Sequence, residues 1–96
     1  MCVFRQETLM ALYRIERRLS AGTPEEIDAA AFRAVACIPH FTGMEWKRSY
    51  LDSEAKLLTC YYEAQSVEDI RKHAEMAHIP CDAVSEVIEY LAEWYR

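Results

Sequence analysis

The sequence lacks long hydrophobic runs and contains little glycine or histidine. Its 96 residues include two glycines and three histidines. No stretch approaches the length of about 20 apolar residues that a membrane-spanning helix needs, so we expect no membrane partner. The N-terminal stretch MCVFRQETL carries an arginine among its apolar residues and leads into no continuous apolar segment. It is therefore not expected to be a secretory signal.

Clustered positive charge and closely spaced cysteines are also missing. The chain carries 11 Lys and Arg against 16 Asp and Glu, for a net charge of -5. Because the basic residues are scattered, we expect no surface that neutralises phosphates and no nucleic-acid partner. The four cysteines, Cys2, Cys37, Cys60 and Cys81, form no CxxC pair, which argues against zinc knuckles and thioredoxin-type redox pairs. We expect reduced thiols in a cytoplasmic protein.

What the sequence does contain is alternation with the period of a β-strand. The first such segment is residues 8–19, TLMALYRIERRL, after which Ser20 and Gly22 break the pattern. Residues 43–64 contain two alternating runs around a polar link at 52–56, which predicts a β-hairpin. Residues 83–90, AVSEVIEY, predict a fourth strand.

Alternation within the hairpin predicts which side chains share a face. We expect one face to combine Met44, Trp46, Arg48, Tyr50, Leu58, Cys60 and Tyr62. Glu63 is then expected on the opposite face. A slip of one residue in the register would exchange these two sets of side chains.

Two other segments carry helical signals. Thr23 and Glu26 form a capping box with Pro24 at the first helical position. Ser66 opens a second helix, which is expected to end before Pro80. The expected apolar stripes are Ile27, Ala31, Ala34, Val35 and Ile38 in the first helix, and Val67, Ile70, Ala74 and Ala77 in the second.

The order strand, helix, strand, strand, helix, strand predicts an α+β, ferredoxin-like βαββαβ fold. We expect one domain over residues 1–96, with a core at about 12–90 and short extensions at both ends. Two helices would cover one face of a four-stranded antiparallel sheet. Since no element is left to cover the other face, a homodimer is expected. The C-terminal LAEWYR is expected to pack on the sheet edge or across a dimer contact.

Three short segments, WKRSYLD, TCYYEA and IPCDAVSEV, resemble in their order and spacing the characteristic segments of a known protein family. It is a family of small, dimeric ferredoxin-like proteins of unknown function that includes a nickel-binding protein. Its pattern is matched by Trp46, Ser49, Tyr50, Cys60, Tyr62, Glu63, Ala64 and Pro80. The resemblance covers roughly residues 12–90. It implies a dimer and binding of a divalent metal ion, nickel, at the dimer surface, but no ligand motif can be carried over.

Two sets of candidate site residues follow. A ligand pocket at the hairpin and the dimer partner would use Trp46, Arg48, Tyr50, Cys60, Tyr62 and Glu63. The metal candidates are Glu63, His73 and His78. The two histidines are five positions apart, about 140° around a helix, so one helix cannot bring both to one ion. The alternative is that these side chains only pack.

The function expected from this sequence is that of a small homodimeric divalent-metal-binding protein, with nickel as the metal by resemblance. Two alternatives stay open. One is a small cofactor-free enzyme of the isomerase, cyclase or monooxygenase type, with its pocket at the sheet, for which fold analogy is the support. The other is a regulatory module that binds a small molecule.

Overall fold

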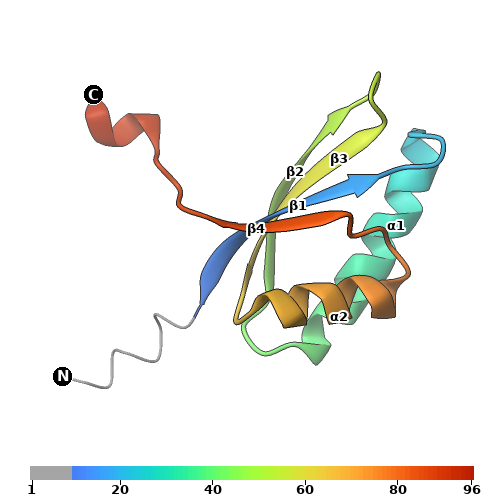
Figure 1. The fold of residues 1–96 in the computed structure, drawn as a ribbon, viewed down its shortest axis with the longest axis horizontal. Helices are drawn as coiled ribbons and strands as arrows, with labels where there is room; N and C mark the ends of the chain where they lie inside the picture. The colour runs from blue at the N-terminus through green and yellow to red at the C-terminus, as the bar shows by residue number, and fades with distance from the viewer. Residues whose placement is uncertain (1–9) are drawn as a thin grey trace.

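The computed structural model describes residues 10–96, and the elements follow the predicted order (Figure 1). The elements are β1 (Ala11–Arg18), α1 (Pro24–Cys37), η2 (Ile38–His40), β2 (Glu45–Asp52), β3 (Leu57–Ala64), α2 (Val67–Ala77), β4 (Ala83–Val87) and η3 (Ala92–Tyr95). The strands form one antiparallel sheet in the order β2-β3-β1-β4. This arrangement confirms the ferredoxin-like fold. Cys2 and the predicted start of the first strand, residues 8 and 9, lie outside the described residues.

The core lies between the sheet and the two helices, which cover one face (Figure 1). Every second residue of β1 points toward the helices, and Tyr13, Ile15 and Arg17 are buried there. Cys60 and Tyr62 of β3 lie beside them, since Ile15 pairs with Cys60 and Tyr13 with Tyr62. The other side of the sheet, which we call the open face, is not covered by either helix.

Helix α1 begins at the predicted capping box, but the glutamate reaches further back than expected. Thr23 Oγ1 accepts a hydrogen bond from the Glu26 N–H at 3.2 Å. The Glu26 carboxylate accepts from the N–H groups of Ser20, Ala21 and Gly22 instead of the Thr23 N–H. These three bonds hold the pKa of Glu26 below its usual value. In the predicted apolar stripe Ala34 is buried, whereas Val35 is 51% exposed, so its assignment to the core is wrong.

Helix α2 is capped as predicted at its start and ends on a left-handed residue. Ser66 Oγ accepts from the Asp69 N–H at 3.0 Å. The helix ends at Ala77 because His78 adopts a φ of 56°, before Pro80 is reached. Val67 is exposed, contrary to the predicted stripe, and the buried face is made by Ile70, His73, Ala74 and Ala77.

A β-bulge in β2 overturns the predicted hairpin faces. Trp46 pairs with Tyr62, but the next pair is Arg48 with Tyr61, so Lys47 is an extra residue without a counterpart in β3. The extra residue reverses the alternation from that point on. Trp46 therefore shares the helix side with Cys60 and Tyr62 as expected. Arg48 and Tyr50 lie on the open face, and their predicted placement is wrong.

The fourth strand is shorter than predicted, and the chain beyond it leaves the sheet. Val87 pairs with Leu12, one residue from the start of β1, so little of the β1 ladder remains for residues 88–90. Residues 88–96, which we call the C-terminal arm, project away from the domain on the side of the open face (Figure 1). Among residues 10–96, no helix is long and apolar enough to cross a bilayer.

Candidate functional site

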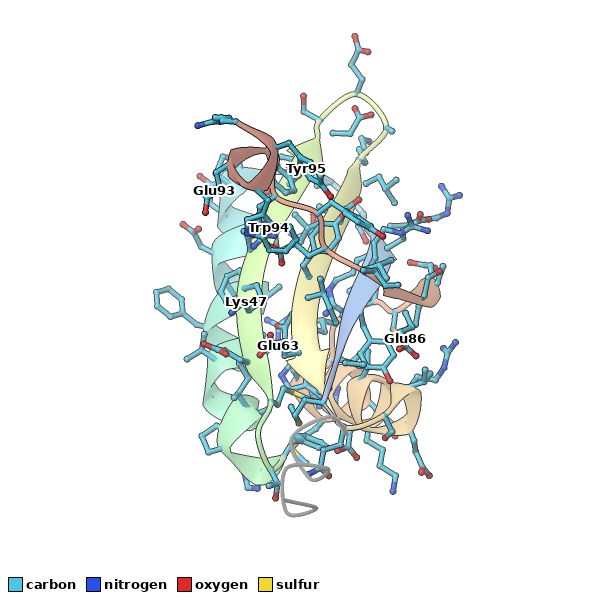
Figure 2. All side chains as sticks on the ribbon, turned by 90° about the vertical axis from the view of Figure 1, so that its left-hand side faces the viewer. Lys47, Glu63, Glu86, Glu93, Trp94 and Tyr95 are labelled. Atoms are coloured by element: carbon cyan, nitrogen blue, oxygen red, sulfur yellow. The ribbon has the colours of Figure 1, made fainter. Side chains whose placement is uncertain are left out.

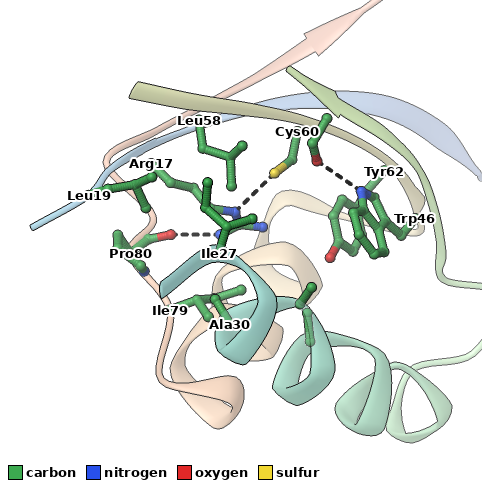
Figure 3. A pocket seen from close by; sticks show the side chains of 13 residues that line it. Arg17, Leu19, Ile27, Ala30, Trp46, Leu58, Cys60, Tyr62, Ile79 and Pro80 are labelled. Atoms are coloured by element: carbon green, nitrogen blue, oxygen red, sulfur yellow. Dashed lines mark hydrogen bonds between the residues drawn. The ribbon is translucent and has the colours of Figure 1, made fainter. Parts of the chain in front are cut away.

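An interior cavity of about 50 Å³ lies between α1 and the sheet (Figure 3). Its lining combines apolar groups of α1 with side chains of β1, β2 and β3: Arg17, Leu19, Ile27, Ala30, Ala31, Ala34, Trp46, Ser49, Leu58, Cys60, Tyr62, Ile79 and Pro80. Alanines on the facing side of α1 leave this space open because they have no atoms beyond Cβ. The polar atoms of the cavity come mainly from the sheet.

Arg17 is the most unusual group of this cavity. It is 3% exposed, and its side chain lies between α1 and the sheet (Figure 3). Its Nε donates to Cys60 Sγ at 3.4 Å, and its Nη1 donates to the Pro80 carbonyl at 2.6 Å. Its Nη2 is buried and has no hydrogen-bond partner among residues 10–96. A guanidinium remains charged at any physiological pH, so the fold encloses a cation.

Burial alters the ionisation of the groups next to Arg17. Burial raises the pKa of Tyr62 to about 12, an effect partly offset by the nearby Arg17 charge. The guanidinium lies 5.8 Å from the centre of the Tyr62 ring, within range of a cation–π interaction. Burial, and secondarily the Arg17 charge, lowers the pKa of His73, although its hydrogen bond to the Ala34 carbonyl acts in the opposite direction. At neutral pH both side chains are therefore uncharged, and Arg17 is the charge in this region.

Trp46 forms the partly exposed wall of the cavity. Its ring stacks on Tyr62 at 6.4 Å between centroids, and its Nε1 donates to Ser49 Oγ at 2.9 Å. The tryptophan is 36% exposed, whereas Cys60 and Tyr62 are buried. Of the six predicted ligand-binding residues, these three line the cavity together.

The hydrogen bonds of Cys60 and His73 lead to different partners. Within residues 10–96 the hydrogen-bond partner of the Cys60 thiol is Arg17, and His73 instead bonds to the Ala34 carbonyl at 2.9 Å. No base is thus held next to the thiol in this part of the chain, as nucleophilic catalysis requires.

The remaining predicted ligand-binding residues, Arg48, Tyr50 and Glu63, lie on the open face. Arg48 Nη2 lies 3.5 Å from Glu89 Oε1, which ties the C-terminal arm to β2. Arg48 also lies over the Tyr61 ring at 5.7 Å. A groove of about 400 Å³ runs under the start of the arm, and it is lined by Leu12, Arg14, Arg48, Tyr50, Tyr61, Val87, Ile88, Glu89 and Tyr90.

The three predicted metal ligands do not meet within one chain. Glu63 is on the open face, where it pairs with Glu45 across the β2–β3 ladder (Figure 2). His73 lies on the buried side of α2 and is 1% exposed, whereas His78 is exposed at the end of the same helix. Residues 10–96 hold no group of three His, Cys, Asp or Glu side chains suited to a metal ion. In a single subunit, the described residues therefore do not form a nickel site.

Arg17 is the site residue that the sequence interpretation missed. A signal was present, because Arg17 is in phase with Tyr13 and Ile15 on the apolar side of the strand. An arginine at such a position is buried if the strand stays regular, and it turns to the solvent side if a bulge shifts the alternation. The pairing of β1 with β3 is regular through Arg17, so the side chain is enclosed.

The topology defines a ferredoxin-like α+β protein, with a small cavity between α1 and the sheet. A family model described as nickel responsive protein SCO4226-like matches residues 13–87, so the chain belongs to this family. A similar solved structure is that of SCO4226 from Streptomyces coelicolor A3(2), with a TM-score of 0.75 and 20% sequence identity. The match covers 84% of this chain and 100% of that one. At this identity the likeness concerns the fold alone. The curated proteins gave no match.

Proposed function

We propose that this protein binds a divalent metal ion, nickel first, as a cytoplasmic homodimer. The observation that carries the proposal is membership of the nickel-responsive family over residues 13–87. Cys37, Cys60 and Cys81 are free thiols, which is consistent with a reducing compartment.

The open face and the C-terminal arm support a second copy as the partner. Along the arm Ile88 is 79% exposed, Tyr90 71% and Tyr95 72%, and Tyr50 on the open face is 60% exposed. Figure 2 looks onto this face, with the arm standing in front of the strands. An isologous dimer in which each arm lies on the partner's open face would bury these apolar groups. An area of about 800 Å² per subunit is usual for a stable interface.

Dimer formation is also what the metal proposal needs. Glu45 and Glu63 lie directly opposite each other on the sheet, where like charges are destabilising. Lys47 Nζ lies 3.6 Å from Glu45 Oε1 and offsets part of this repulsion, and a bound cation would offset the rest. The missing ligands would come from the second subunit. His78 is proposed as a ligand at a second position, the exposed end of α2, since imidazole is a donor that suits nickel. His73 is assigned to the core, because a metal ion would reach it only by opening the fold.

Isothermal titration of the tag-free protein with nickel chloride tests this proposal. We expect micromolar or tighter binding that weakens at least about tenfold in Glu63→Ala. Glu68→Ala is the matched control, because this carboxylate is equally charged but sits on the outer face of α2. His78→Ala tests the second position. Absence of binding heat in the wild type, or equal affinity in Glu63→Ala and Glu68→Ala, would contradict a metal site at the open face.

A further inference from the structure

We propose that the interior cavity at Arg17 binds a small monocarboxylate, with the carboxylate on the guanidinium and a short alkyl chain along α1. This site lies on the helix side of the sheet, so it is separate from the metal position proposed at the open face. It is built from Arg17, Cys60, Tyr62 and the apolar wall of Ile27 and Ala30 (Figure 3).

The first step of the argument is the unmatched charge of Arg17. Enclosing an ion in a protein is unfavourable unless an opposite charge and full hydrogen bonding compensate for the lost hydration. Here the partners are a thiol, which is a weak acceptor, and one carbonyl. Within residues 10–96 no carboxylate forms an ion pair with Arg17. A bound anion would supply both the charge and the acceptor that Nη2 lacks.

The second step is the kind of anion. A carboxylate is planar and matches the N–H groups of a guanidinium, to which it forms short, charge-assisted bonds. Arg17 is the one cation in the cavity lining, and the whole chain carries a net charge of -5. Both facts favour a monoanion over a phosphate dianion, which is usually held by several cationic groups.

The third step is size. The cavity of about 50 Å³ exceeds the space of about 10 to 15 Å³ that one water needs, so it can hold a few non-hydrogen atoms. Beyond the guanidinium, most of the wall is aliphatic, and the rings of Trp46 and Tyr62 form one side of it. A straight chain of two or three carbons fits this description, whereas an aromatic acid or a nucleotide is too large.

The fourth step is access. Among the large side chains of the lining, Trp46 is the most exposed, at 36%. Its contacts with the rest of the protein include one ring stack on Tyr62 and a hydrogen bond to Ser49. The cavity is not fully enclosed, so a small anion can enter it beside this ring, and the same ring reports on what enters.

The experiment follows Trp46 fluorescence during titration with butyrate at constant ionic strength. The chain has two tryptophans, so the titration uses a Trp94→Phe background in which Trp46 is the single emitter. We expect a saturable change at millimolar butyrate and at least about tenfold weaker binding of butyramide, which has the same shape without the charge. Arg17→Met should abolish the response. Arg14→Met, on the opposite face of the same strand, should leave it unchanged.

Two further measurements distinguish a lost site from a misfolded protein. Arg17→Met should keep or raise the melting temperature without ligand, because well-packed apolar replacements of buried ions are often neutral or stabilising. Ala31→Leu fills the cavity while Arg17 stays, and it should also abolish the response. The proposal is overturned by a flat titration in the wild type, by equal responses to butyrate and butyramide, or by an unchanged butyrate response in folded Arg17→Met.

Discussion

At the scale of single residues, His73 shows how a polar side chain is accommodated in a small core. Its ring lies 5.4 Å from that of Tyr62 and 5.8 Å from that of Phe41, and its Nε2 bonds to the Ala34 carbonyl. This hydrogen bond joins α2 to α1 through the interior. The neutral imidazole therefore acts as a packed, hydrogen-bonded core residue, and the charged form is disfavoured in the folded state.

The lowered pKa of His73 predicts that stability falls in mild acid. The unfolded chain binds a proton near the ordinary histidine pKa of 6.5, whereas the folded chain does so only at lower pH. The contribution is thus fully present above pH 6.5 and is lost as pH falls toward the folded pKa. The free energy of unfolding should drop by up to about 1.4 kcal/mol per pH unit in that window.

Chemical denaturation at several pH values between neutrality and mild acid measures this dependence. His73→Gln, which is neutral throughout, should flatten the slope. His40→Gln, at an exposed histidine in η2, should retain it. A slope that persists unchanged in His73→Gln would mean that other groups cause the acid sensitivity.

At the scale of elements, the end of α2 is a strained cap held by several contacts. His78 has the left-handed φ of 56°, and the N–H groups of His78 and Ile79 donate to the Glu75 and Ala74 carbonyls. Arg33 of α1 donates to the Ala77 and His78 carbonyls at 2.8 and 3.2 Å. The last turn is thereby satisfied even though it carries a residue with a Cβ at a position that glycine prefers.

We therefore predict that His78→Gly stabilises the protein. A non-glycine residue in this conformation costs roughly 1–2 kcal/mol, while glycine loses about 0.5–1 kcal/mol through its greater freedom in the unfolded chain. The net gain in unfolding free energy should reach up to about 1.5 kcal/mol, measured by denaturant titration. His78→Ala keeps the Cβ and should show no such gain. Destabilisation by His78→Gly would show that the imidazole itself supports the cap.

The helix starts could be predicted from the sequence because their signals are local. Thr23 and Ser66 each accept a hydrogen bond from the residue three positions later, and both bonds are present. The element order follows from the same local patterns. The end of β4 could not be predicted in this way, because it depends on pairing with β1, in which Leu12 with Val87 is the last pair.

The candidate site could be predicted only in part, for a physical reason. Trp46, Cys60 and Tyr62 line one cavity as the alternation indicated. Arg48 and Tyr50 do not, because the bulge at Lys47 depends on how β2 pairs with β3 and leaves no mark on the pattern of β2 itself. Arg17 could be identified as site-forming only with the helices in place, since its missing partner is a property of the packed structure.

At the scale of the whole molecule, the C-terminal arm gives a flat domain an extended shape. The longest and shortest principal extents are 49 and 19 Å. The arm contributes exposed Ile88, Tyr90, Trp94 and Tyr95, and its ion pair to the sheet joins Glu89 and Arg48. So much exposed apolar surface on a projecting segment is typical of a contact with another chain.

Sedimentation equilibrium at micromolar concentration should therefore give a dimer. Truncation after Val87 removes the arm but leaves β4 intact, and it should yield a folded monomer. Phe32→Ser is the matched control, because this phenylalanine is 76% exposed on α1 and lies away from the arm. A monomeric wild type would contradict the dimer proposal, and a dimeric truncation would contradict the role of the arm.

The bulge in β2 has a consequence for how this gene can change. Eight residues of β2 are matched by seven of β3, so the hairpin carries one residue more than its ladder requires. Deletion of the Lys47 codon would restore a regular ladder and leave Arg48 opposite Tyr61, so the residues of β2 would keep their present faces. Insertion of one codon after Arg48 would instead add a second unmatched residue or turn the residues beyond it to the opposite face. Single-codon deletions at the bulge should therefore be accepted more readily in this strand than single-codon insertions.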